Sequence, residues 1–93
     1  MEQLTAYRES IDAIDEQLIE LLGRRYAVCR DVARLKRQRN IPMMQTGRVE
    51  QVKARCAALA ERHGVDPRFV RDLYGLIIDE ACRIEDQIID GAG

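Results

Sequence analysis

The fold is decided by residues 4–39, LTAYRESIDAIDEQLIELLGRRYAVCRDVARLKRQR, a stretch without proline. Its apolar residues recur at alternating steps of three and four, the spacing that puts side chains on one face of an α-helix. This seam consists of Leu4, Tyr7, Ile11, Ile14, Leu18, Leu21, Val28, Val32 and Leu35. At about 1.5 Å per residue such a helix spans about 50 Å, far more than a compact domain of 93 residues needs. We therefore predict one long helix whose seam packs against a second copy of the chain.

Two further helices are predicted after residues 40–45, NIPMMQ, where Pro42 forbids a continuous helix. The second helix begins near Thr46, a suitable N-cap, and ends at His63-Gly64. The third follows Asp66-Pro67, a capping residue with proline at the first helical position, and ends at Gly91. The predicted inward residues are Val49, Val52, Cys56 and Leu59 in the second helix and Val70, Leu73, Tyr74, Ile77, Ala81, Ile84 and Ile88 in the third. The sequence thus predicts a single all-α domain over residues 1–93, with a long, a short and a medium helix.

Composition excludes several classes of function. A net charge of −1 gives no general attraction to nucleic acid or to an anionic membrane. We find no signal peptide and no apolar run of about 20 residues. The three widely spaced cysteines, Cys29, Cys56 and Cys82, indicate buried thiols rather than a disulfide framework or a zinc site. We expect a cytoplasmic protein without metal or cofactor, and we find no glycine-rich phosphate loop and no nucleophile paired with a base.

The strongest chemical signal is Arg25, which occupies a position of the apolar seam. A buried arginine is costly unless it meets an anion, so it indicates either an ion pair or an anionic ligand. Its side chain could also reach solvent along the helix surface. Lys36 follows 11 residues later, which places it about 16 Å away and within about 20° of the same direction. Together the two cations could bracket a small dicarboxylate.

Two more arginines extend this set of cations. Arg48 lies where the second helix opens, beside free backbone N–H groups that favour anions. Viewed alone, Lys36 would be interpreted as a solvated surface lysine, whereas Arg48 would fit a surface arginine and an anion site equally well. Arg8 lies near the same seam but 28 residues before Lys36, about 42 Å along a straight helix. Arg8 therefore cannot share a site with its own Lys36, although it could serve the site of an antiparallel partner.

Four stretches carry a family resemblance, namely YRESIDAIDEQLIELLGRR (7–25), VARLKRQRNIP (32–42), GRVEQV (47–52) and GVDPRFVRDLYGLIIDEACRIED (64–86). In this order they resemble the all-helical, type II chorismate mutases over nearly the whole chain. The resemblance implies an intertwined helical-bundle homodimer with two sites, each lined by the long helix of one chain and closed by an arginine of the other. It also implies a small-molecule dicarboxylate substrate.

The resemblance assigns roles residue by residue. Arg8 is similar to the arginine that one chain of the dimer contributes to the site of the other chain. Arg25 and Lys36 are similar to the two cations on the long helix, and Arg48 is similar to the cation on the second helix. Glu85 stands where the family usually has a glutamine that faces the breaking ether, so Lys36, Glu85 and Arg25 are the implied catalytic residues.

The chain departs from the family pattern at three further positions. Ala81 replaces a small hydroxyl residue, Gln45 an acidic loop residue and Val49 a glutamate. The last two positions surround the C4 substituent of the substrate, which indicates a rebuilt C4 pocket. The implied substrate-binding positions are therefore Arg8, Arg25, Lys36, Gln45, Arg48, Val49, Ala81 and Glu85.

The implied reaction is the intramolecular Claisen rearrangement of a chorismate-type dianion. The runs IPMMQ, GRV and CRIED are more similar to the 4-amino-4-deoxychorismate mutases of antibiotic biosynthesis, so the favoured conversion is 4-amino-4-deoxychorismate to 4-amino-4-deoxyprephenate. One alternative is an ordinary chorismate mutase. Others are an isochorismate pyruvate lyase, or a non-catalytic helical dimer that regulates an aromatic-pathway enzyme.

Overall fold

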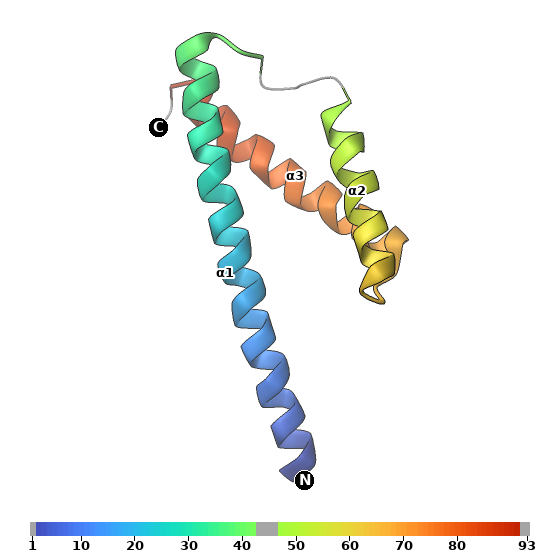
Figure 1. The fold of residues 1–93 in the computed structure, drawn as a ribbon. Helices are drawn as coiled ribbons and strands as arrows, with labels where there is room; N and C mark the ends of the chain where they lie inside the picture. The colour runs from blue at the N-terminus through green and yellow to red at the C-terminus, as the bar shows by residue number, and fades with distance from the viewer. Residues whose placement is uncertain (1, 43–46, 92–93) are drawn as a thin grey trace.

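The computed structural model describes residues 2–42 and 47–91, which form three helices (Figure 1). These are α1 (Glu2–Arg39), α2 (Arg48–Arg62) and α3 (Pro67–Ile89), and no strand occurs among the described residues. The predicted all-α order of a long, a short and a medium helix is confirmed.

The helix ends follow from local sequence. The side chain of Asp66 accepts a hydrogen bond from the backbone N–H of Arg68 at 2.8 Å, and Pro67 opens α3, as predicted. Gly64, just after α2, has a φ of 72°, a left-handed conformation that glycine adopts without steric cost. At the other end of α2 the N-cap is Gly47, with a φ of 81°. The predicted cap, Thr46, lies outside the described residues. The structure instead has Gly47 as the N-cap of α2, which the sequence pattern did not predict.

Helix α3 is the helix on which the other two helices pack. It packs against both α1 and α2, whereas α1 and α2 do not pack against each other in the described part of the chain (Figure 1). The contact with α2 is a small core of Val52, Cys56, Ala60 and Val70, against which Tyr74 and Ile78 pack. Toward α1, the hydroxyl of Tyr26 donates to the backbone oxygen of Ile77 at 3.2 Å. In this arrangement α3 forms the floor of a cavity that α1 and α2 flank.

The first half of α1 is uncovered. Every residue from 2 to 21 is exposed, and Figure 1 shows this part of α1 extending away from the other two helices. Seam residues such as Tyr7 and Leu18 expose 69% and 55% of their surface. Two expected core residues, Leu59 and Leu73, are also more than a third exposed. Much of the apolar surface of the described chain is therefore exposed to solvent. None of the described helices has the length and apolar character that a membrane span requires.

Candidate active site

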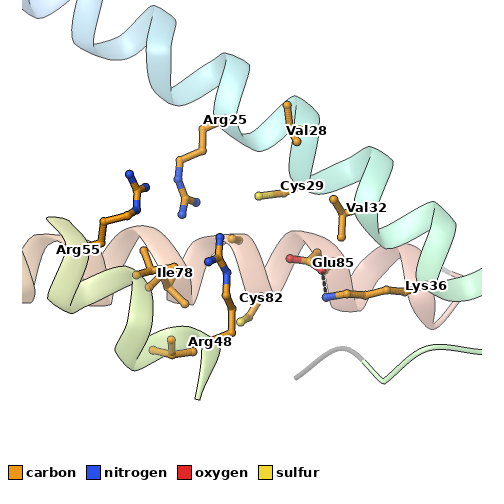
Figure 2. A pocket seen from close by; sticks show the side chains of 13 residues that line it. Arg25, Val28, Cys29, Val32, Lys36, Arg48, Arg55, Ile78, Cys82 and Glu85 are labelled. Carbon is orange, nitrogen blue, oxygen red and sulfur yellow. Dashed lines mark hydrogen bonds and ion pairs between the residues drawn. The ribbon is translucent and has the colours of Figure 1, made fainter. Parts of the chain in front are cut away.

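A cavity of about 590 Å³ is lined by side chains of α1, α2 and α3 (Figure 2). Six residues predicted for the site line it, namely Arg25, Lys36, Arg48, Val49, Ala81 and Glu85. All three helices contribute, because α1 carries Arg25 and Lys36, α2 carries Arg48 and Val49, and α3 carries Ala81 and Glu85. Gln45 lies outside the described residues. Arg8 is exposed on the free half of α1 and does not line the cavity of its own chain.

At one end of the cavity Lys36 and Glu85 form an ion pair. The ammonium of Lys36 donates to Oε1 of Glu85 at 3.0 Å, and the two side chains are only 13% and 11% exposed. Figure 2 shows this pair bridging α1 and α3 at the edge of the cavity. A charge pair that is this well shielded from water interacts more strongly than a surface pair. Lys36 and Glu85, two of the catalytic residues that the resemblance implies, are therefore direct neighbours.

Arg25 lies further along α1 and is half-buried. Its guanidinium carbon is 5.7 Å from the centroid of the Tyr74 ring, a cation–π contact. It forms no ion pair with any acid of the described chain. Among the described residues the ion-pair explanation for this arginine is therefore wrong, and Arg25 is left with capacity for an anionic ligand.

Helix α2 brings two arginines to the cavity. Arg48 lies in its first turn and donates to the neutral amide oxygen of Gln51 at 2.8 Å. Arg55 also lines the cavity, and sequence reasoning missed it. The spacing contained the signal, because Arg55 follows Arg48 by seven residues, two helical turns, and so shares its face. Neither arginine is paired with an acid in the part of the chain that the structure describes.

The rest of the wall is apolar or carries a thiol. Val49, Ala81 and Ile78 are among the apolar lining residues, and the thiols of Cys29 and Cys82 also line the cavity. Burial raises the pKa of both thiols above the ordinary cysteine value, so both stay neutral at physiological pH.

The chemistry of the cavity suits a small anion. Among the described residues that line it, three guanidinium groups lack an acid partner, and the one carboxylate, Glu85, is bonded to Lys36. The apolar wall can contact a carbon ring, and the volume lies within the roughly 300–1,000 Å³ of small-ligand pockets. No cluster of three or more potential metal-binding side chains occurs among the described residues.

Comparisons with known proteins identify the family to which the chain is similar. The model of the family "Chorismate mutase type II" matches residues 7–86. The chain is 42% identical over 90 residues to a 4-amino-4-deoxychorismate mutase of Streptomyces pristinaespiralis, covering 97% of this chain and 70% of the relative. It is 41% identical over 87 residues to a 4-amino-4-deoxychorismate mutase of Streptomyces venezuelae, covering 94% and 84% of the two chains. A chorismate mutase of Methanocaldococcus jannaschii is 27% identical over 90 residues, which cover 97% of this chain and 91% of the relative.

The family match includes residues of all three helices and every described residue that lines the cavity. The chain therefore belongs to the type II chorismate mutase family, a family of isomerases.

Proposed function

We propose that this protein rearranges 4-amino-4-deoxychorismate to 4-amino-4-deoxyprephenate. The observation that carries the proposal is the set of three guanidinium groups around one cavity that lack acid partners among the described residues. They suit a substrate that bears two carboxylates. The choice of the amino compound is supported by the two Streptomyces relatives, at 42% and 41% identity, which are named for it.

The reaction breaks one C–O bond and forms one C–C bond inside a single molecule. It needs no covalent intermediate and no net proton transfer. The protein has to hold the reactive, chair-like conformer and to stabilise the negative charge that grows on the ether oxygen. We assign the carboxylates to Arg25 and to Arg8 of a partner chain, with Arg48 supporting them. Lys36 and Glu85 are assigned to the ether oxygen, to which Glu85 can donate only when it carries a proton.

A second candidate substrate is chorismate itself, favoured by the full-length similarity to the Methanocaldococcus jannaschii enzyme. The two compounds differ at C4, where one has an amino group and the other a hydroxyl. Val49 presents an apolar side chain to the cavity, at a position where the family resemblance implies a glutamate. Val49 therefore changes the surroundings of C4, whereas the arginines assigned to the carboxylates are unchanged.

We further propose that the active form is a homodimer in which Arg8 reaches the site of the partner chain. Residues 2–21 are all exposed and carry an uninterrupted apolar seam, which a second copy would cover. Arg8 lies on this segment, about 42 Å along α1 from Lys36, so it can contribute only to another chain's cavity.

The test is to incubate the purified protein with each compound and to identify the product by NMR. We expect both to rearrange, with kcat/KM at least about tenfold higher for the amino compound, which corresponds to about 1.4 kcal/mol of transition-state binding. A preference of that size for chorismate would instead favour the second candidate. Release of pyruvate would favour a lyase, and no reaction with either compound would contradict the proposal.

A further inference from the structure

We propose that Arg55 is a further substrate-binding residue, which holds a carboxylate of the substrate jointly with Arg25 across the gap between α2 and α1. This inference rests on the proposed function for the identity of the ligand. It adds to the site a residue that the family resemblance did not supply.

The position of Arg55 is the first argument. It lines the cavity from α2, two turns after Arg48. Figure 2 shows Arg55 and Arg48 rising from α2 toward Arg25, which descends from α1. The pair of Lys36 and Glu85 lies at the other end of the same view. The guanidinium groups are therefore gathered at one end of the cavity, where one carboxylate could accept from more than one of them.

The second argument is that Arg55 has no partner among the described residues. No hydrogen bond or ion pair is formed by its side chain there. Other arginines of the chain do find acids, since Arg34 pairs with Asp31 at 3.0 Å and Arg83 with Glu80 at 2.7 Å. Arg55 therefore keeps all of its hydrogen-bond donors available for a ligand in the cavity.

Tyr74 lies beside both arginines. The guanidinium carbon of Arg25 is 5.7 Å from the centroid of its ring. Burial raises the pKa of the Tyr74 phenol, and the neighbouring Cys56 acts in the same direction. The positive charges of Arg25 and Arg55 both act against this rise in pKa, as expected of two cations close to the same phenol.

The two arginines lie on helices whose described residues do not contact each other, so a ligand bound to both would connect the helices. α1 and α2 do not pack against each other in the described chain, and like charges face each other across their gap. A carboxylate that accepts from Arg25 and Arg55 neutralises this repulsion and joins the two helices. An arginine fork can also hold a carboxylate through two parallel hydrogen bonds, which a lysine cannot reproduce.

The experiment compares Arg55→Gln and Arg55→Lys with Arg62→Gln, which makes the same charge change on α2 at an exposed residue outside the cavity wall. KM and kcat are measured with both compounds. Binding is measured separately by calorimetric titration of prephenate, a dicarboxylate of the product type. We expect Arg55→Gln to raise KM and to weaken prephenate binding at least about tenfold, Arg55→Lys to recover only part of this loss, and Arg62→Gln to stay within about twofold of wild type.

The outcomes separate this inference from the proposed function. If Arg55→Gln matches Arg62→Gln in both KM and prephenate affinity, the role of Arg55 is refuted even though the enzyme turns over. If the wild-type protein binds prephenate and loses this affinity in Arg55→Gln but rearranges neither compound, the carboxylate site is supported and the mutase function fails. A wild-type protein that binds no prephenate and rearranges neither compound refutes both.

Discussion

The ammonium of Lys36 on α1 lies 3.0 Å from the carboxylate of Glu85 on α3, although 49 residues separate them in the sequence. The ion pair ties α1 to α3 at the end of the cavity opposite the arginines. In the described conformation Glu85 therefore accepts a hydrogen bond. To donate one to an ether oxygen it would have to carry a proton.

We expect Glu85→Gln to keep turnover and Glu85→Leu to lose it. The amide of glutamine can donate a hydrogen bond to an ether oxygen, whereas leucine offers no donor. We expect kcat to stay within about tenfold of wild type in Glu85→Gln and to fall by about a hundredfold or more in Glu85→Leu. The matched control is Asp86→Asn, an exposed acid next to it on α3, which should keep the wild-type kcat. A Glu85→Leu enzyme that is folded and as fast as wild type would refute this role.

Arg25→Leu should separate function from stability. Arg25 has no acid partner in the described chain, so its replacement leaves no buried carboxylate unpaired. We expect turnover to fall by about a hundredfold or more while the melting temperature stays unchanged or rises. Arg24→Leu, at an exposed neighbouring position, serves as the control for a lost arginine on α1. A large loss of stability with residual turnover would instead mean that Arg25 is structural.

Mixing two inactive variants tests whether the site is shared between chains. In a mixed dimer of Arg8→Ala and Arg25→Ala, one site has both arginines and the other has neither. Random exchange of an equal mixture should therefore restore about a quarter of wild-type activity, since half of the dimers are mixed and half of their sites are intact. Light scattering on the same samples gives the oligomeric state. A folded, active monomer, or a mixture that stays inactive after exchange, would contradict the dimer proposal.

The alkylation rates of the cavity thiols, Cys29 and Cys82, test the structure of the cavity without an assay of turnover. Burial raises the pKa of Cys29 and Cys82, so at a given pH each holds less thiolate than an unfolded cysteine. We expect alkylation by iodoacetamide at about pH 8 to be at least about tenfold slower than in the unfolded chain, and to speed up as pH rises. Prephenate should protect both thiols, as followed by mass spectrometry. Cys56, which is 5% exposed in the core, is the internal control and should react only on unfolding.

Much of the fold was predictable because it depends on local sequence. The periodic seam of residues 4–39 specifies α1, and Asp66-Pro67 specifies the start of α3. Arg25 and Lys36 could be grouped in advance since both lie on one straight helix. The positions of Ala81, Val49 and Glu85 came only from the family resemblance, because no spacing rule relates residues on different helices.

Other features of the site depend on tertiary packing. The ion pair of Lys36 with Glu85 depends on how α1 crosses α3, which no local pattern specifies. The spacing of Cys29 and Cys82 indicates buried thiols, whereas the structure places both on the wall of the cavity. Arg55 shares the helical face of Arg48, but which face of α2 meets the cavity is set by its packing on α3. Sequence spacing therefore grouped the cations of α1 and missed Arg55, which a second helix brings to them.

The arrangement of the helices around α3 also has a consequence for biosynthesis. A ribosome delivers α1 first, then α2 and then α3. In the described residues α1 and α2 do not pack against each other, so before α3 emerges neither helix has the partner on which it packs in the folded chain. The cavity wall can be completed only after α3 leaves the exit tunnel. Folding of the cavity is thus coupled to the emergence of α3 rather than proceeding helix by helix.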